Sequence, residues 1–258
     1  MFRNGLRAIA RATYRAAGHY PVTVRGTNLK VDPYHLGFWR DLGRGAWEPS
    51  LLQFLEDSLT RDSTFLDLGA WIGPATLFAA KRCRRVFAIE PDPAAYRHLL
   101  WNLELNAIQN AMPFQVAIGE ETGLRRLDAR GERLGDSKST LLPGEGSGAE
   151  TEVVCLSWGD WLALAGQPRI DCMKIDIEGG EFEVLPAIRD YLASERPKLH
   201  LSLHVLSLPQ EHRGRAIEAA TEALRAYANV RDERGALLSL ADAEQEARLR
   251  NCTLVLSG

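Results

Sequence analysis

Acidic side chains at the ends of strand patterns are the residues of this chain best suited to bind a small molecule. Asp67 lies in FLDLG, Glu90 ends RVFAIE, and Asp176 and Glu178 follow the run CMKI. Because the carboxyl ends of parallel strands meet at one edge of a sheet, we expect these carboxylates to converge. Such a group can bind an ammonium or a ribose hydroxyl, or accept a proton from a substrate hydroxyl.

The glycine turn after Asp67 limits which nucleotide-like ligand the chain can bind. In GAWIGP, Trp71 and Pro74 stand where a dinucleotide-binding turn needs its second and third glycines after Gly69, and no GK[ST] follows. A pyrophosphate is therefore disfavoured. Glu90 lies about twenty positions after Gly69, the spacing at which an acidic residue binds a ribose.

S-adenosylmethionine fits these constraints because it carries a ribose and no pyrophosphate. The Asp67 carboxylate suits the ammonium of its amino-acid end, and the helix N-terminus expected at Pro74 suits its carboxylate.

Strand and helix patterns alternate through the middle of the chain, which predicts a parallel sheet with right-handed crossovers. The expected elements are a hairpin over 21–36, a helix starting near Pro49, the strand TFLDLG, a helix from Pro74 to about Arg82, the strand RVFAIE, a helix from Pro93 to about Asn106, and the strand PFQVAIG.

The second half of the chain begins with GLRRLDA and TEVVCLS, which predict two strands around a long, polar, glycine-rich loop. Ser157 and Asp160 have capping-box spacing at the start of a short helix. The strands RIDCMKIDIEGGE and KLHLSLHVL and a helix near 210–228 follow. We expect VRDERGALL and RNCTLVLS, separated by an acidic loop, to form an antiparallel edge pair.

Four motifs in this order resemble the FkbM family of S-adenosylmethionine-dependent methyltransferases: FLDLGAWIG, VFAIEPDPAAYRHLLWNLELN, FQVAIG and MKIDIEGGEFEVLPA. The resemblance spans about 47–204. It implies an α/β, Rossmann-like class I methyltransferase fold, with a seven-stranded, mostly parallel sheet, helices on both faces and an N-terminal extension. It also implies O-methylation of a hydroxyl on a sugar or glycan, a polyketide or a related metabolite.

The chain matches the family's usual pattern at the Glu48-Pro49 pair and departs from it at two places. It has GAWIG where the family usually has GANxG, and Leu156-Ser157 where the family has a Leu-Asp pair. The first departure affects the methionine end of the cofactor site, and the second removes a carboxylate.

The candidate site follows from the motifs and the resemblance together. The expected cofactor-binding residues are Asp67, Gly69, Ala70, Trp71, Gly73, Glu90, Pro91, Ala117 and Asp176. Trp71 is expected to wall the methionine or acceptor side of the pocket. Asp176 is the preferred base or orienting group, with Glu178 and His204 as further catalytic candidates; the alternative for Asp176 is a buried carboxylate paired with Lys174.

Other polar residues of these motifs are expected to be structural. Asp92 is interpreted as a helix cap, and Asn102 and Asn106 as packing residues on one helix face.

Composition indicates a globular protein. The resemblance implies a methyltransferase domain, expected over 47–258, with an extension over 1–46. Among 258 residues 25% are charged and the net charge is -3, so no nucleic-acid partner is expected, and the acceptor is predicted to be a small molecule or glycan. The four scattered cysteines suggest neither a zinc site nor disulfides, and no metal is expected. A cytoplasmic location is the expectation.

Arg3, Arg7, Arg11 and Arg15 recur at helical spacing near the N-terminus. They predict either a solvated basic helix or weak peripheral contact with a membrane. Three other functional alternatives remain: a catalytically inactive scaffold on this fold, a protein or nucleic-acid methyltransferase, and an NAD-dependent enzyme. The oligomeric state is left open.

Overall fold

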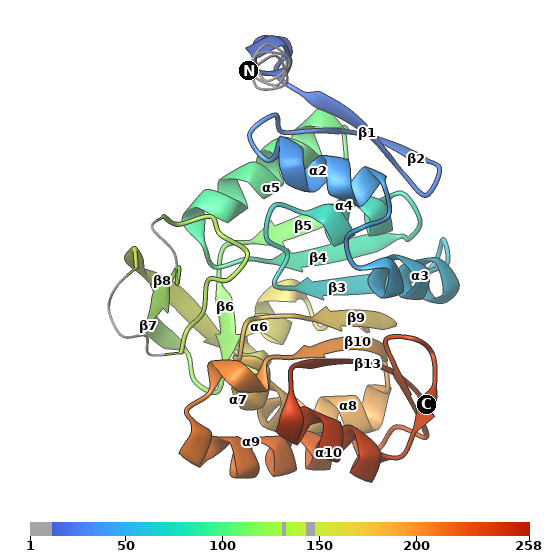
Figure 1. Ribbon diagram of the computed structural model, residues 1–258, viewed down its shortest axis with the longest axis vertical. Helices are drawn as coiled ribbons and strands as arrows, with labels where there is room; N and C mark the ends of the chain where they lie inside the picture. Colours follow the sequence, from blue (N-terminus) through green and yellow to red (C-terminus); the bar gives the residue numbers. More distant parts are fainter. Residues whose placement is uncertain (1–11, 131–132, 143–147) are drawn as a thin grey trace.

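A computed structural model describes residues 12–130, 133–142 and 148–258. Its centre is an eight-stranded sheet with helices on both faces (Figure 1). The strands run in the order β12 (Leu237–Leu238), β11 (Asn229–Asp232), β13 (Cys252–Ser257), β10 (Lys198–Leu203), β9 (Cys172–Ile175), β3 (Thr64–Leu68), β4 (Arg85–Ile89) and β5 (Ala111–Phe114). The five strands from β10 to β5 are parallel, and the other three pair antiparallel.

The sheet has one strand more than the seven expected because VRDERGALL divides into β11 and β12. The division falls at a tight turn, where Gly235 has φ +86° and the Asp232 carboxylate accepts the backbone N–H groups of Arg234 and Ala236. The expected antiparallel pairing of VRDERGALL with RNCTLVLS is confirmed, because β11 pairs antiparallel with β13. The pair is not at the edge of the sheet, since β12 lies outside β11 and β13 lies between β10 and β11. The acidic loop before it is the helix α10 (Leu240–Leu249), capped by Ser239 and Asp242.

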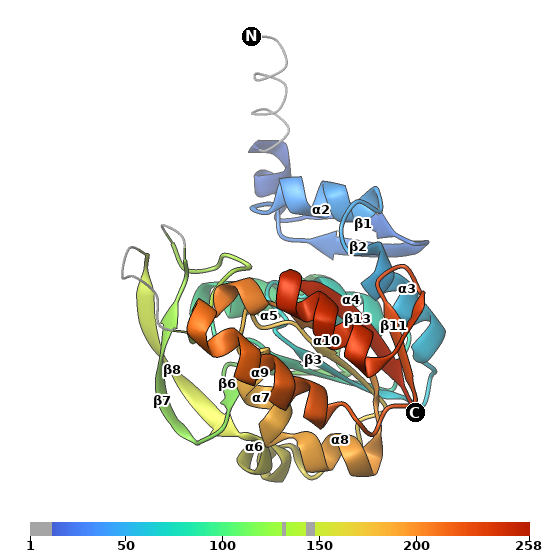
Figure 2. The same ribbon diagram turned by 60° about the horizontal axis from the view of Figure 1, so that its bottom comes forward.

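The predicted strand PFQVAIG is also two strands. β5 ends at Phe114 on the edge of the main sheet, and β6 (Ala117–Gly119) leaves that sheet to pair with β8 (Glu150–Ser157). β8 also pairs antiparallel with β7 (Gly123–Asp128), as expected for the two strands flanking the long loop. This three-stranded sheet stands beside the carboxyl ends of the main strands (Figures 1 and 2).

Each face of the main sheet has its own apolar core. On one face pack α6 (Trp158–Ala165), α7 (Glu181–Ala187), α8 (Arg189–Glu195), α9 (Gln210–Ala223) and α10. On the other pack α3 (Pro49–Ser58), α4 (Pro74–Ala80) and α5 (Pro93–Leu105), together with α2 (Leu36–Gly43) and the hairpin of β1 (Tyr20–Val24) and β2 (Thr27–Val31). Buried side chains of the hairpin and of α3 and α4 belong to the same cluster, so the N-terminal segment completes this core.

Local caps fix the helices that border the site. Asp92 accepts the N–H groups of Ala94 and Ala95 at the start of α5, and Ser157 accepts that of Asp160 at the start of α6, which confirms both predicted caps. Asn102 and Asn106 confirm their structural role by bonding to the backbone of Asp32 and Lys30 in the N-terminal segment.

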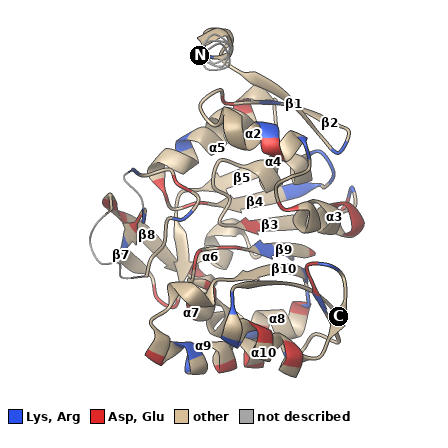
Figure 3. Cartoon of the chain, in the orientation of Figure 1, with Lys and Arg blue, Asp and Glu red and all other residues tan. Residues whose placement is uncertain are grey.

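Charge is mixed over the molecule. Both α9 and α10 carry acidic and basic side chains (Figure 3). Of the predicted basic N-terminal helix, Arg3, Arg7 and Arg11 lie outside the described residues. Among the described helices, none is long and apolar enough to cross a membrane.

Candidate active site

One cavity of about 850 Å³ lies at the carboxyl ends of β3, β4, β9 and β10. It brings together nearly all of the residues proposed from sequence. Its lining includes Asp67, Gly69, Ala70, Trp71, Glu90, Pro91, Ala117, Asp176, Glu178 and His204. Gly73 is not among the lining residues.

The two glycines of the turn, Gly69 and Gly73, have different structural roles. Gly69 has φ +84°, and a Cβ there would lie 1.9 Å from the carbonyl oxygen of Asp176, so any side chain would force the turn away from β9. Gly73 precedes α4 with φ +95°, and a Cβ there would meet Leu99 of α5 at 2.7 Å. Gly73 therefore allows close helix packing rather than contact with a ligand in the cavity.

Glu90 is a buried carboxylate whose two oxygens each already accept one backbone N–H. Trp71 donates to Oε2 at 2.7 Å and Asp92 donates to Oε1 at 2.8 Å. Burial raises the pKa of Glu90 to about 7, although both hydrogen bonds oppose that shift. Each oxygen keeps a further lone pair, so the group can accept ribose hydroxyls across the cavity.

Trp71 forms part of the cavity wall and holds the opposite loop. Its backbone is left-handed, with φ +49°, and its ring packs edge-on against Phe38 at 4.6 Å. The indole Nε1 donates to the carbonyl oxygen of Gly135 at 2.9 Å. Gly135 also donates its N–H to Asp92, which in turn accepts the Ser139 hydroxyl. Trp71 and Asp92 thus pin the segment 133–142 over the cavity.

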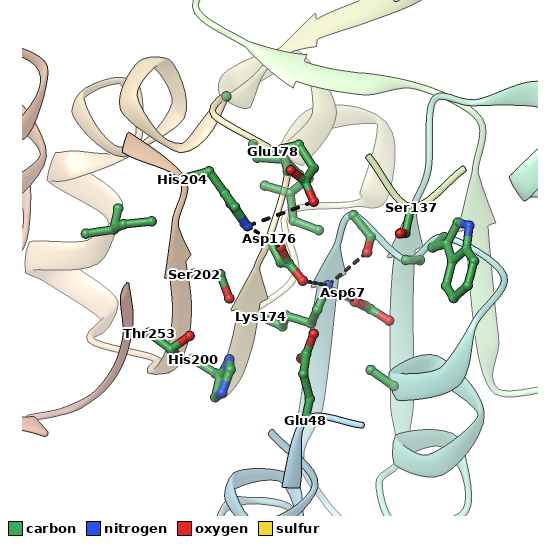
Figure 4. A pocket seen from close by; sticks show the side chains of 18 of the residues that line it. Glu48, Asp67, Ser137, Lys174, Asp176, Glu178, His200, Ser202, His204 and Thr253 are labelled. Carbon is green, nitrogen blue, oxygen red and sulfur yellow. Dashed lines mark hydrogen bonds and ion pairs between the residues drawn. The ribbon is translucent and has the colours of Figure 1, made fainter. Parts of the chain in front are cut away.

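A buried lysine joins two of the carboxylates. Lys174 Nζ lies 3.4 Å from Asp67 Oδ1 and 3.5 Å from Asp176 Oδ2, and it donates to the Gly69 carbonyl at 2.8 Å (Figure 4). Burial raises the pKa of Asp67, against the effect of Lys174 and of a hydrogen bond from Thr76. Burial alone would lower the pKa of Lys174, but Asp176 and Asp67 raise it, so this lysine is charged.

His204 follows β10 and faces the two carboxylates that follow β9. Its Nε2 lies 3.7 Å from Asp176 Oδ1 and 3.9 Å from Glu178 Oε1 (Figure 4), and its Nδ1 donates to buried Glu181 at 3.0 Å. Burial would lower the pKa of His204, but Glu181 and then Asp176 and Glu178 raise it to about 9. At neutral pH the ring is an imidazolium, which makes it a hydrogen-bond donor rather than a base.

The pocket floor opposite the glycine turn is apolar. Ala117 and Ile118 of β6 line it together with Leu127 of β7. These side chains come from the three-stranded sheet, because β6 pairs with β8 and not with the main sheet. A flat aromatic base such as adenine fits this wall.

Four lining residues were not predicted from sequence to bind the cofactor or to act in catalysis. They are Glu48, which precedes α3, and His200, Ser202 and Thr253 on β10 and β13 (Figure 4). Ser202 and Thr253 are opposite one another in the β10–β13 register, which no local pattern shows. Glu48 did have a signal, since the Glu48-Pro49 pair matches the family's usual pattern.

Comparison with known proteins identifies a matching protein family. The Methyltransferase FkbM domain model matches residues 67–231. The curated "Uncharacterized protein MJ1452" of Methanocaldococcus jannaschii is 32% identical over 82 residues, covering 32% of this chain and 30% of that protein. The match thus spans less than a third of that relative's length.

Solved structures give weaker likenesses. Methyltransferase FkbM from Methylobacillus flagellatus is 16% identical with a TM-score of 0.46, covering 84% of this chain and 60% of that one. SMU.1697c, a putative methyltransferase from Streptococcus mutans in complex with SAH, is 10% identical with a TM-score of 0.46, covering 80% and 94%. M. jannaschii TYW2 in complex with AdoMet is 12% identical with a TM-score of 0.43, covering 93% and 84%.

Proposed function

This chain belongs to the FkbM methyltransferase family, and on that premise we propose that it transfers a methyl group from S-adenosylmethionine to a hydroxyl oxygen of a small molecule or glycan. The observation that supports the proposal best is that one cavity is lined both by the Gly69 turn and Glu90 and by the cluster of Asp176, Glu178 and His204. A cofactor site and a group able to orient a hydroxyl thus share one space.

The cofactor, S-adenosylmethionine, suits the chemistry of the lining. Glu90 would accept its ribose hydroxyls, Ala117 and Ile118 would contact its adenine, and the turn of Gly69 and Ala70 would hold its methionine end. Trp71 closes the side of the pocket next to the loop segment 133–142.

When bound, S-adenosylmethionine would supply a methyl group activated for in-line displacement by the acceptor oxygen, with S-adenosylhomocysteine as the leaving group. Asp176 accepts a hydrogen bond from the acceptor hydroxyl and takes its proton as the new bond forms. Lys174 and the imidazolium of His204 flank the Asp176 carboxylate and hold its two oxygens in place. Positioning of the acceptor hydroxyl against the methyl group does most of the work.

The proposal is tested first by calorimetry with S-adenosylmethionine and S-adenosylhomocysteine on the purified protein, and next by transfer of a labelled methyl group to a panel of hydroxylated acceptors. We expect both ligands to bind, and we expect Asp176→Asn to bind them with nearly unchanged affinity while transfer falls about 100-fold or more. Absence of binding by either ligand would overturn the proposal. Full turnover by Asp176→Asn would remove Asp176 from its role.

A further inference from the structure

Glu48 combines a rare backbone conformation with a side chain that lines the cavity. It is the residue before α3, with φ +34° and ψ +62°, in the left-handed region that non-glycine residues rarely adopt. A residue at this position usually caps the helix with its side chain, but Glu48 makes no such bond. Its side chain instead enters the cavity (Figure 4).

The helix holds this conformation rigidly. Pro49 is the first helical residue, and the N–H of Leu52 donates to the Glu48 carbonyl oxygen at 3.2 Å. Leu51 and Leu52 are fully buried in the core between α3 and the sheet. The backbone of Glu48 is therefore held at the wall of the cavity.

That carboxylate lacks a partner for one of its oxygens. Oε2 of Glu48 is buried and has no hydrogen-bond partner within the described part of the chain. Leaving a buried acceptor unpaired costs free energy, and more so when the group is charged. A ligand that enters the cavity with a donor group would remove that cost.

The charges around Glu48 show which donor fits. Asp67 of β3 and Asp176 after β9 add two more carboxylates, and Lys174 of β9 lies between those two. Two histidines also face this space. His204 lies close to three carboxylates, those of Asp176, Glu178 and Glu181, so its positive charge is already compensated. His200 is neutral because burial lowers its pKa to about 4. The space beside Glu48 therefore has an excess of negative charge.

We propose that Glu48 binds the ammonium group of the cofactor's methionine end, and that this contact makes cofactor binding release a proton near neutral pH. The inference rests on the proposed function, since it assigns the cofactor as ligand. An ammonium supplies a hydrogen-bond donor for Oε2 of Glu48. It also adds a positive charge beside three carboxylates, Glu48, Asp67 and Asp176, that otherwise have only Lys174 between them.

Proton release follows from the state of Glu48 in the free protein. Burial and the nearby Asp176 charge raise the pKa of Glu48 to about 7, so the group is partly protonated at neutral pH. An adjacent ammonium favours the ionised form and lowers that pKa, so binding expels the proton. Glu90 has a similarly raised pKa. A ribose hydroxyl that donates to its carboxylate also favours the ionised form, so this contact also releases a proton.

Two ligands separate these contributions. S-adenosylhomocysteine carries both the ribose and the amino-acid end, whereas 5′-methylthioadenosine carries the ribose and lacks the ammonium. Calorimetry at pH 7 in two buffers of different ionisation enthalpy gives the affinity and the protons released for each ligand. The variant is Glu48→Gln, and the matched control is Glu56→Gln on the same helix, whose side chain pairs with Arg25 and Arg82 away from the cavity.

We expect Glu48→Gln to weaken S-adenosylhomocysteine by about tenfold or more and to reduce its proton release, with little change for 5′-methylthioadenosine. Glu56→Gln should leave both ligands unaffected. Equal loss for both ligands in Glu48→Gln, or unchanged affinity and proton release, would overturn the assignment while leaving the proposed function intact. Failure of the unmodified protein to bind S-adenosylhomocysteine would overturn both.

Discussion

At the scale of single residues, the site is a set of carboxylates whose environments differ. Glu90 is buried and accepts backbone N–H groups, whereas one oxygen of Glu48 has no partner among the residues that the structure describes. Asp176 lies between Lys174 and His204. These differences give similar side chains different tasks. Glu90 suits neutral hydroxyls, Glu48 suits a cation, and Asp176 suits a hydroxyl that is losing its proton.

Glu90→Gln tests the ribose assignment. The amide keeps the shape but replaces one acceptor oxygen with a donor, which opposes the N–H of Trp71 or Asp92. We expect affinity for S-adenosylhomocysteine and for 5′-methylthioadenosine to fall together, by about tenfold or more, in calorimetry. This pattern differs from that of Glu48→Gln. Unchanged affinity for both ligands would show that the ribose lies elsewhere.

Glu48 also predicts a pH dependence for the stability of the free protein. A carboxyl group whose pKa is raised in the folded state contributes stability below its unfolded pKa, and that contribution is lost as the pH rises through the folded value, here about 7. Glu48→Gln should therefore stabilise the free protein at pH 8.5 relative to the unmodified chain, and less so at pH 5.5. Urea unfolding at the two pH values measures the difference in unfolding free energy between the variant and the unmodified chain. An equal loss of stability in the variant at both pH values would contradict the prediction.

At the scale of elements, sequence patterns located most helices and strands, since their boundaries depend on local signals such as Pro49, Pro74 and Pro93 at helix starts. The patterns failed where pairing depends on distant strands. PFQVAIG reads as one strand, but its second half pairs with β8, some forty residues later. Sequence order likewise cannot show that β13 enters between β10 and β11.

The candidate site divides in the same way. The strand-end carboxylates and the glycine turn could be found because topology places them at one edge of the sheet. Ser202 and Thr253 could not, because they meet only through the β10–β13 register. The sequence predicted that Trp71 forms part of the cavity wall, but not that it holds the loop. Its hydrogen bond to Gly135 joins the glycine turn to a loop whose sequence has no helix or strand pattern.

Trp71→Phe tests that attachment. The ring can still pack on Phe38, but the bond from Nε1 to Gly135 is lost, which removes about 1 kcal/mol from the anchoring of the segment 133–142. We expect faster amide hydrogen exchange at Gly135 and Thr140 and a several-fold loss of cofactor affinity. In the control Trp158→Phe, no indole bond is lost, since Nε1 of Trp158 has no partner among the described residues. Equal exchange in the two variants would show that the Trp71 indole does not anchor the loop.

At the scale of the whole molecule, the N-terminal segment is tied to the cofactor turn through one buried amide. Asn102 of α5 accepts the N–H of Asp32 at 2.6 Å and donates to the Ile72 carbonyl oxygen at 2.8 Å. Asp32 is fully buried and also accepts the indole N–H of Trp39 in α2. The extension, α5 and the turn that contains Trp71 are therefore parts of one bonded unit.

Asn102→Ala should consequently affect both folding and binding. It leaves the Asp32 N–H and the Ile72 carbonyl without partners, which we expect to cost about 2 to 3 kcal/mol of unfolding free energy in urea titration. The neighbouring Asn106→Ala, which loses bonds to Lys30 in a more exposed place, should cost about 1 kcal/mol or less. Because only Asn102 contacts the turn, only its variant should also weaken S-adenosylhomocysteine binding. If both variants lose stability equally and bind the ligand normally, Asn102 does not couple the extension to the cofactor turn.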